Sequence, residues 1–397
     1  MKKIIDSLKY IHLKDLLSPF IFIFILPFAL IFRLFNKIRK KELWLICESG
    51  NTARDNGYHF FKYVRENYPN DYCFYVIDKN CCDYQKVKKY GNIIQFKSFK
   101  HWLYYLSAKY NISNQKNGNP NQVFFYFIHV SLGLYKNRVF LQHGITKDNS
   151  LWLYYKNTKF KYFICGAKKE YDYIKEKFGY HDGNVIYTGF PRFDNLYNNN
   201  VNKKQILIMP TWRNWLGREM NSFGQQFNFL NTDYFKNWNG LLTDSEFIKY
   251  IEDNNYIVYF YPHLNMQKFL NSFRTDSSNI KILDNSLYDI QDLLKDSQLL
   301  ITDYSSVYMD FAYMKKPIIY FQFDYEEYRK KQYQEGYFDY YRDGFGPVVS
   351  NKKELIESTK VSMKIGLEDK YLKRINNFFE NFSPDSSSKI YQILKQK

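Results

Sequence analysis

The chain has 397 residues, more than one typical hydrophobic core organises, so its length indicates two domains. Its formal net charge of +17 favours an anionic partner, such as nucleic acid, acidic lipid or a phosphorylated substrate, and charge alone does not choose among them. The five cysteines have no Cys-x-x-Cys spacing and no neighbouring histidine cluster, which excludes a disulfide framework and a zinc site.

Residues 1–41 differ in composition from the rest of the chain. Residues 16–32 are 17 uncharged, mostly aliphatic and aromatic residues with basic residues on both flanks, and no signal-peptidase pattern follows them. As a helix they would be about 25 Å long, short of the roughly 30 Å core of a membrane, and Pro19 and Pro27 would kink it. The pattern favours a segment that lies in or dips into an anionic leaflet, with a helix buried in the fold as the alternative.

From residue 43 onward, apolar strands alternate with helices, which indicates a doubly wound parallel sheet. The predicted strands cover residues 43–47, 73–77, 92–96, 139–142, 162–165 and 185–187, and the predicted helices cover 56–67, 99–108 and 168–178.

A second alternating series follows an asparagine-rich linker at residues 195–204. Its predicted strands cover residues 205–209, 256–261, 280–283, 299–301 and 318–321. We therefore expect an α/β protein with two Rossmann-like domains that bind ligands between them, at the carboxyl ends of both sheets. The expected division is a membrane-associating segment at 1–41, α/β domains at 42–200 and 201–370, and a C-terminal helix at 371–397.

The polar turn Thr302-Asp303-Tyr304-Ser305-Ser306 lies between an apolar strand and an amphipathic helix. In such a βαβ unit, backbone N–H groups and the positive end of the helix dipole converge at the carboxyl edge of the sheet. Together with the hydroxyl groups, this turn predicts a phosphate site. Ordinary helix capping is the alternative, since Asp and Ser favour that position in helices of every kind.

Two histidines also follow predicted strands. His143 precedes Gly144, and His263 follows Pro262, so each domain places one imidazole at the carboxyl edge of its sheet. A neutral imidazole there can accept a proton from a hydroxyl group. A structural histidine is the alternative for either residue.

Several charged and polar residues share this placement. Thr211 and Arg213 follow the strand at 205–209, where a guanidinium group can bind a phosphate in bidentate fashion. Arg192 lies in a turn at the end of the first domain and faces either ligand or solvent. Glu48 and Asp55 bracket the first loop, where either can orient His143 or the substrate, although a helix cap suits Asp55 better.

The sequence also excludes some functions. It has no Gly-x-Gly-x-x-Gly or Walker-type loop, which argues against dinucleotide oxidoreductases and P-loop enzymes. Neither carboxylate pairs nor histidine clusters have metal-ligand spacing, so we predict neither a metal nor a cofactor. The positive residues are spread along the chain without a recognisable nucleic-acid module, which argues against nucleic acid as the partner.

Taken together, the motifs resemble the CDP-glycerol glycerophosphotransferases, which include teichoic-acid primases, polymerases and their capsule-making relatives. The resemblance covers about residues 43–360. There are two departures: Gln142 replaces the residue usual before His-Gly, and the second histidine follows a proline where the family's tends to precede one. The motifs are Glu48 with Asp55-Asn56, Gln142-His143-Gly144, Gly189-x-Pro191-Arg192-x-Asp194, Pro210-Thr211-Trp212-Arg213, and Ile301 to Ser306 with Asp310-Phe311 and Lys316-Pro317.

The resemblance implies a GT-B fold, with a CDP-linked donor held mainly by the second domain and the acceptor entering from the first. It also implies peripheral or monotopic attachment to the cytoplasmic face of the bacterial membrane, where a lipid-linked or polymeric acceptor resides. The reaction we expect is transfer of glycerol phosphate or ribitol phosphate from CDP-glycerol or a related CDP-polyol to an acceptor hydroxyl.

In this hypothesis His143 is the general base, and His263 and Arg213 stabilise charge on the pyrophosphate. The turn hydroxyls of Thr302, Ser305 and Ser306 hold the pyrophosphate oxygens. Two alternatives stay open: a GT-B glycosyltransferase that uses a sugar nucleotide, and a basic membrane-tethered protein that binds an anionic polymer or nucleic acid. The remaining predicted substrate contacts are Glu48, Gly144, Arg192, Thr211 and Asp303.

Overall fold

A computed structural model describes residues 13–116, 118–197, 203–218, 229–284 and 287–396. The chain divides into two units, each of which is described by itself. Unit 1 comprises residues 1–145, 151–195 and 383–397, and unit 2 comprises residues 146–150 and 196–382.

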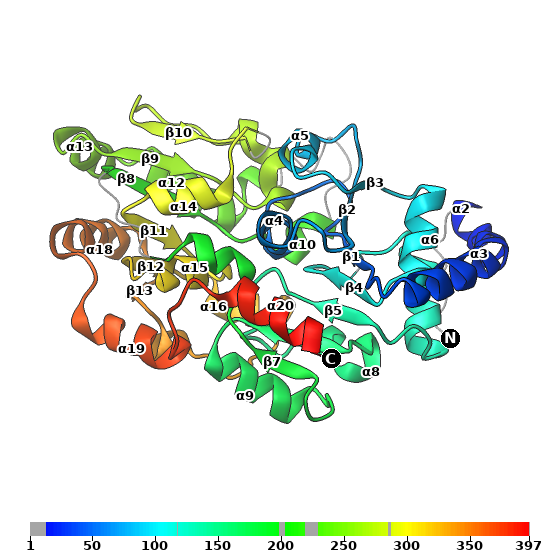
Figure 1. The fold of residues 1–397 in the computed structure, drawn as a ribbon. Coiled ribbons are helices and arrows are strands. Elements are labelled where there is room, and N and C mark those ends of the chain that lie inside the picture. The colour runs from blue at the N-terminus through cyan, green and yellow to red at the C-terminus, as the bar shows by residue number, and fades with distance from the viewer. Residues whose placement is uncertain (1–12, 117, 198–202, 219–228, 285–286, 397) are drawn as a thin grey trace. The chain divides into compact units, whose positions relative to one another are not determined.

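The described residues of unit 1 form a seven-stranded parallel sheet in the order β3-β2-β1-β4-β5-β6-β7 (Figure 1). Its strands are buried and mostly apolar, as expected of a parallel sheet covered on both faces. The order of the strands reverses between β1 and β4, so a crevice is expected at their carboxyl ends. The strands are β1 (Trp44–Ile46), β2 (Cys73–Ile77), β3 (Ile93–Gln95), β4 (Tyr110–Ser113), β5 (Arg138–Phe140), β6 (Tyr162–Cys165) and β7 (Val185–Tyr187).

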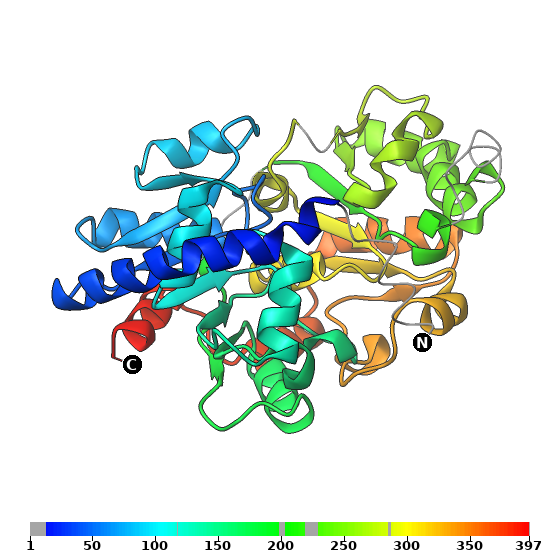
Figure 2. The same ribbon diagram turned by 90° about the vertical axis from the view of Figure 1, so that its right-hand side faces the viewer.

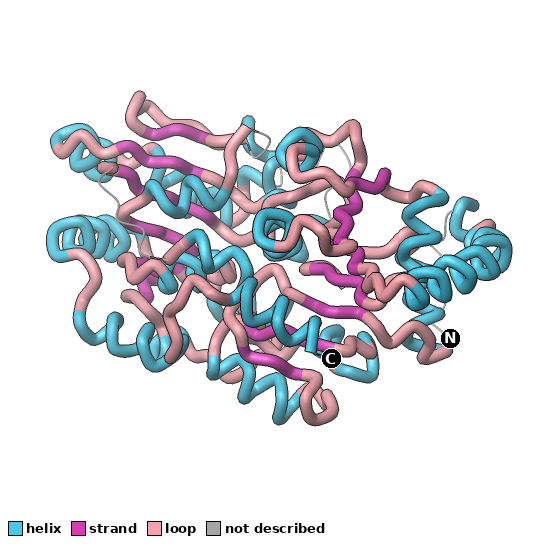
Figure 3. The backbone as a smooth tube through the Cα atoms, viewed as in Figure 1, coloured by secondary structure: helices cyan, strands magenta, loops and turns pink. Residues whose placement is uncertain are grey.

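Helices cover both faces of this sheet (Figure 3). In β1, Trp44 and Ile46 join the core beneath α4 and α20, whereas Leu45 joins a second core beneath α6 and α3, because successive side chains of a strand point to opposite faces. The helical segments of unit 1 are α2 (Leu13–Leu16), α3 (Ser18–Ile38), α4 (Asn56–Asn67), α5 (Tyr84–Lys88), α6 (Phe99–Ser107), α7 (Gln122–Tyr126), η1 (Phe127–Ser131), η2 (Leu151–Leu153), α8 (Tyr155–Thr158), α9 (Lys168–Lys177), η3 (Pro191–Asn195) and α20 (Ser386–Gln396).

The N-terminal helix α3 is longer than the predicted apolar segment. It continues through Pro27 to Ile38, so its 21 residues extend about 31 Å, close to the thickness of a hydrocarbon core. By length and composition it is the one helix in the described chain that qualifies as a membrane span, and it lies along α6 (Figure 2). The Oγ atom of Ser107 in α6 donates to the Ala29 carbonyl of α3 at 3.1 Å. One face of α3 therefore packs against the rest of unit 1.

Unit 2 has a second parallel sheet, with six strands among its described residues in the order β10-β9-β8-β11-β12-β13. Here the order reverses between β8 and β11. The strands are β8 (Gln205–Met209), β9 (Ile257–Phe260), β10 (Ile280–Ile282), β11 (Leu299–Thr302), β12 (Ile318–Phe321) and β13 (Val348–Val349). The helical segments are α10 (Asn214–Arg218), α12 (Asp233–Leu242), α13 (Ser245–Asp253), η4 (Leu264–Ser272), α14 (Ile290–Asp296), α15 (Val307–Tyr313), α16 (Tyr325–Lys331), α17 (Tyr340–Asp343), α18 (Lys352–Ile365) and α19 (Asp369–Phe379).

The C-terminal region is two helices, not the single helix expected at 371–397. The first, α19, belongs to unit 2, whereas α20 belongs to unit 1. The carboxylate of Asp194 accepts hydrogen bonds from the backbone N–H groups of Ser386 and Ser387, both at 2.9 Å. The rings of Tyr391 and Tyr68 stack with 3.8 Å between centroids. These contacts fix α20 on unit 1. The expected domain boundary at 200–201 lies outside the described residues.

Candidate functional site

His143 lies at the carboxyl edge of the unit 1 sheet, three residues beyond β5, and its side chain is exposed. Desolvation is the largest influence and lowers its pKa below the ordinary 6.5, and the charge of Arg192 lowers it further. The carboxylate of Asp55 and a hydrogen bond to the backbone of Asn114 act in the opposite direction. The ring is thus accessible, and the lowered pKa favours its neutral form, as a proton acceptor requires.

The residue before His143 has an unusual backbone. Gln142 adopts the left-handed conformation with φ of +57°, which costs a non-glycine residue about 1 kcal/mol or more. Its Nε2 atom donates to the Ile164 carbonyl at 2.7 Å and to Oε1 of Glu170 at 3.0 Å. The buried side chain of Asn56 donates to the Gln142 carbonyl at 2.7 Å. These contacts stabilise the strained turn that precedes the histidine.

Three polar side chains form a network next to His143. Asp55 accepts hydrogen bonds from Arg192 Nη1 at 2.9 Å and from Asn114 Nδ2 at 2.6 Å. It also caps α4, because its carboxylate accepts from the Asn56 N–H at 2.7 Å. Asn114 follows β4, so the network lies where the order of the strands reverses. Arg192 is buried and already engages a carboxylate.

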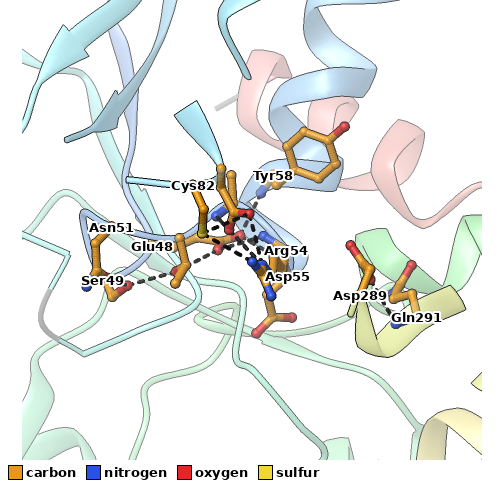
Figure 4. Close-up of polar contacts among 12 residues, drawn as sticks. Glu48, Ser49, Asn51, Arg54, Asp55, Tyr58, Cys82, Asp289 and Gln291 are labelled. Atoms are coloured by element: carbon orange, nitrogen blue, oxygen red, sulfur yellow. Dashed lines mark hydrogen bonds and ion pairs between the residues drawn. The ribbon is translucent and has the colours of Figure 1, made fainter. Parts of the chain in front are cut away.

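Glu48 organises the loop that follows β1 (Figure 4). It is buried, and its carboxylate accepts from the backbone N–H groups of Asp55 at 3.0 Å, Tyr58 at 2.9 Å and Arg54 at 3.2 Å. Burial first, and then the charge of Asp55, raise the pKa of Glu48 to about 8, while these three hydrogen bonds oppose the rise. Glu48 therefore shapes the loop that carries Asp55 and does not face a substrate.

In unit 2, Arg213 and two acids form a buried network. The Arg213 side chain is fully buried and pairs with Asp324 at 2.7 Å and with Asp303 at 2.9 Å. Its Nη1 atom donates to the Thr211 carbonyl at 2.9 Å. Asp303 in turn accepts from the backbone N–H groups of Thr211 and Tyr304 at 2.8 and 2.7 Å. The guanidinium group is thus enclosed, so the predicted bidentate contact with a phosphate does not fit this geometry.

The turn after β11 contains hydroxyl groups with different environments. Thr302 is buried and donates to the Met209 carbonyl at 2.7 Å, which ties β11 to β8. Ser305 and Ser306 are partly exposed, and Ser306 makes no side-chain capping hydrogen bond to α15. The Oγ1 atom of Thr211 is buried without a hydrogen-bond partner among the described residues. Ser305, Ser306 and Thr211 are therefore the hydroxyls of this edge that suit a ligand.

The second histidine, His263, begins η4 at the same edge of the unit 2 sheet. It is partly exposed, and its ring lies 6.1 Å from that of Trp212 in a stacked arrangement. Its Nδ1 atom accepts a hydrogen bond from the Asn265 N–H at 3.2 Å. The neutral ring therefore carries its proton on Nε2, which makes it a donor suited to a phosphate oxygen.

Unit 1 thus brings together His143, Asp55 and Arg192, and unit 2 brings together Arg213, Asp303 and Thr211. Three participants were not predicted as site residues: Asn56, Asn114 and Asp324. Asn114 follows β4, which is not among the predicted strands, and Asp324 follows β12 directly after Phe323. A polar residue just past an apolar strand was the available signal for Asp324.

The chain matches the family described as CDP-Glycerol:Poly(glycerophosphate) glycerophosphotransferase over residues 28–396. It belongs to this family. The matched range includes all the site residues above, and the resemblance expected from the motifs is confirmed.

Family relatives differ in how much of their length this chain spans. The minor teichoic acid biosynthesis protein GgaB of Bacillus subtilis is 35% identical over 374 residues, which cover 92% of this chain but 40% of GgaB. A teichoic acid poly(glycerol phosphate) polymerase of Bacillus spizizenii is 26% identical, covering 92% of this chain and 95% of the polymerase.

Solved structures extend the comparison to the fold. The wall teichoic acid polymerase TagF aligns with a TM-score of 0.64 and 18% identity over 93% of this chain and 96% of that chain. A UDP-GlcNAc 2-epimerase of Methanocaldococcus jannaschii aligns with a TM-score of 0.54 and 12% identity, over 90% of this chain and all of that chain. At these identities the likeness establishes two parallel-sheet α/β units of the kind found in TagF.

Proposed function

We propose that this protein transfers a polyol phosphate, sn-glycerol phosphate in the simplest case, from a CDP-linked donor to a hydroxyl group of a lipid-linked or polymeric acceptor. Membership of the glycerophosphotransferase family supports the reaction type. The observation that carries the chemistry is the exposed His143 ring, whose pKa is lowered and which adjoins the Asp55, Asn114 and Arg192 network.

In this mechanism His143 is the general base. It takes the proton of the acceptor hydroxyl as that oxygen forms a bond to the β-phosphorus of the donor. The bond between this phosphorus and the bridging oxygen breaks, and CMP leaves with both electrons. Asp55 favours the imidazolium ion formed in this step, because its charge raises the pKa of His143. A positioned base typically contributes about 10² to 10⁴ in rate.

Unit 2 binds the donor in this proposal. The hydroxyls of Ser305, Ser306 and Thr211 contact pyrophosphate oxygens, and His263 donates through Nε2 to the same group. Arg213 acts indirectly: its ion pair with Asp303 holds the carboxylate that fixes the backbone of Thr211 and of the turn. Phosphoryl transfer depends mainly on such positioning and on charge neutralisation.

The test is CMP release from CDP-glycerol with a polymeric acceptor. His143→Ala is expected to lower kcat by about 10² to 10⁴ with little change in donor KM. The matched control is His181→Ala, which removes an exposed imidazole elsewhere in unit 1. Near-normal turnover of His143→Ala would overturn the assignment of the base.

Donor binding is tested separately. Ser305→Ala should mainly raise donor KM, whereas Ser278→Ala, which removes an exposed hydroxyl elsewhere in unit 2, should leave it unchanged. If Ser305 were only a helix cap, its loss would lower stability by about 0.5 to 2 kcal/mol and leave donor KM unaltered. A panel of CDP-polyols and sugar nucleotides, read by CMP or nucleoside diphosphate release, distinguishes this activity from that of a glycosyltransferase.

We further propose that α3 attaches unit 1 to the cytoplasmic face of the membrane without crossing it. The helix packs along α6 through a face that includes Ile25 and Ala29, while side chains such as Phe20, Phe24 and Ile31 are at least 65% exposed. A helix committed to its own domain along its length fits the plane of the interface better than a membrane span. The substrate-bearing end of a lipid-linked acceptor lies at that interface.

A further inference from the structure

A basic hollow lies between α3 and the loops that follow α6, η1 and α8 in unit 1. Its volume is about 850 Å³, and Phe22 and Leu26 of α3 contribute apolar lining. Figure 2 shows α3 lying lengthwise along this side of unit 1. The cationic residues that line the hollow are Arg33, Lys37, Lys41, Lys109, Lys136 and Lys161.

The charge of this hollow is poorly compensated. Among the described residues that line it, Glu42 is the one carboxylate, and it pairs with Lys109 at 2.6 Å. Arg33, Lys37 and Lys136 have no carboxylate partner in the described part of the chain. Like charges gathered in one hollow repel each other unless an anion occupies it. The hollow therefore has the electrostatic character of an anion site.

A second observation points in the same direction. Asn36 lines the hollow, and its side chain is 6% exposed. Its Nδ2 group has no hydrogen-bond partner among the residues that the structure describes. A buried amide donor that forms no hydrogen bond destabilises the fold by about 1 to 3 kcal/mol. For this reason nearly all such groups in native proteins bind a partner, which can be a water molecule or a ligand. A phosphate oxygen in the hollow would accept this hydrogen bond.

The position of the hollow indicates the source of the phosphate. It adjoins the exposed apolar face of α3, and Leu134 on its rim is 48% exposed. Phe22, which lines the hollow, packs against Tyr135 with 6.3 Å between ring centroids, so the rim is joined to α3. We infer that this hollow binds the phosphate headgroup of an anionic membrane lipid, whose acyl chains contact the apolar face of α3. This inference rests on the proposed membrane attachment.

The experiment measures the partition of the purified full chain onto phosphatidylglycerol vesicles and phosphatidylcholine vesicles by flotation. Arg33→Gln/Lys37→Gln removes two charges that line the hollow. The matched control is Arg39→Gln/Lys40→Gln, which removes two charges from the same end of the helix outside the hollow. If only a general surface potential attracts the protein, both variants should lose the same amount of vesicle binding, about fivefold for each charge removed.

If the hollow is a specific headgroup site, Arg33→Gln/Lys37→Gln should lose at least about tenfold more binding to phosphatidylglycerol vesicles than the control does. The extra loss comes from hydrogen bonds to charged groups, so it should be absent on phosphatidylcholine vesicles. Asn36→Leu tests the site without changing charge. Asn36 lies seven residues after Ala29, on the same buried face of α3, where leucine is compatible with the helix, and the substitution should weaken binding to phosphatidylglycerol alone.

Three results would overturn the inference. If the two charge variants lose equal amounts of vesicle binding and Asn36→Leu binds as the wild type does, the attraction to the membrane is diffuse and the hollow is no specific site. Binding of soluble glycerol phosphate that Arg33→Gln/Lys37→Gln abolishes, together with equal binding of the two charge variants to phosphatidylglycerol vesicles, would mean that the hollow takes a free phosphate. Failure of the wild-type chain to bind either kind of vesicle would contradict the proposed membrane attachment. The transferase activity would still be tested independently by CMP release with a soluble acceptor.

Discussion

Arg213 provides a sharp test of how unit 2 holds the carboxyl edge of its sheet. Arg213→Met keeps most of the side-chain volume and removes the charge, which leaves Asp303 and Asp324 buried without their cation. Removing one partner of a buried ion pair typically costs about 3 to 5 kcal/mol, a large share of the 5 to 15 kcal/mol that stabilises an ordinary domain. We expect a loss of stability in that range for unit 2.

The loss should depend on pH. Burial raises the pKa of Asp303, and Arg213 is the main opposing influence, so the variant raises that pKa further. A carboxyl group whose pKa is raised in the folded state contributes stability at low pH that is lost as pH rises. The deficit of Arg213→Met is therefore smallest in acid and largest at neutral pH. Asp303→Asn added to Arg213→Met should recover part of it.

The assay is urea denaturation together with hydrogen exchange measured by mass spectrometry, because exchange separates peptides of unit 1 from those of unit 2. Protection should fall in β8, β11 and the turn after β11, and remain unchanged in unit 1. If Arg213→Met were as stable as the wild type but had lost donor affinity, the guanidinium group would contact the donor directly, and its assignment as a positioning residue would be wrong.

Three other substitutions test separate parts of the structure. Asp55→Asn keeps a capping side chain but removes the charge that raises the pKa of His143, so the acid limb of the kcat/KM profile should move to lower pH; an unmoved limb contradicts the network. Glu48 has its pKa raised from 4.5 to about 8, so its contribution to the free energy of unfolding is present below pH 4.5 and is lost toward pH 8. Glu48→Gln should flatten that decline in urea titrations, and an unchanged slope would exclude Glu48 as its source. Lys316→Met removes hydrogen bonds of 2.6 to 3.0 Å to three carbonyls around the end of α14 and should cost about 2 to 4 kcal/mol, whereas exposed Lys315→Met should cost less than about 0.5. Equal effects of the two lysines would contradict the capping role.

The strands of both sheets were predictable where burial on two faces makes the sequence apolar throughout. Cys73–Ile77 and Gln205–Met209 are such runs, and the predicted bounds equal the observed ones. β4 was missed because two of its four residues, Asn111 and Ser113, are polar. β13 has two residues and becomes a strand through its pairing with β12. The pairing of β4 and of β13 with a neighbouring strand, which makes each of them a strand, cannot be read from its own residues.

The placement of site residues followed from the topology, but their partners did not. A polar residue after a parallel strand lies at the carboxyl edge of the sheet, and His143 and Arg213 do lie at that edge of their sheets. The topology alone could not separate a ligand contact from an internal ion pair, because Asp324 lies 111 residues beyond Arg213 in sequence. The charge of Arg213 was therefore assigned to a phosphate, whereas the fold uses it to neutralise two acids.

The return of α20 to unit 1 affects the order in which the protein can be made. Helix α20 completes the core that contains Trp44 of β1, and it lies in sequence beyond all of unit 2. During translation, unit 2 can therefore reach its final fold while unit 1 still lacks a helix. Until α20 emerges, the apolar surface around Tyr68 has no cover from it, and such transiently exposed surface is where a nascent chain is prone to aggregate.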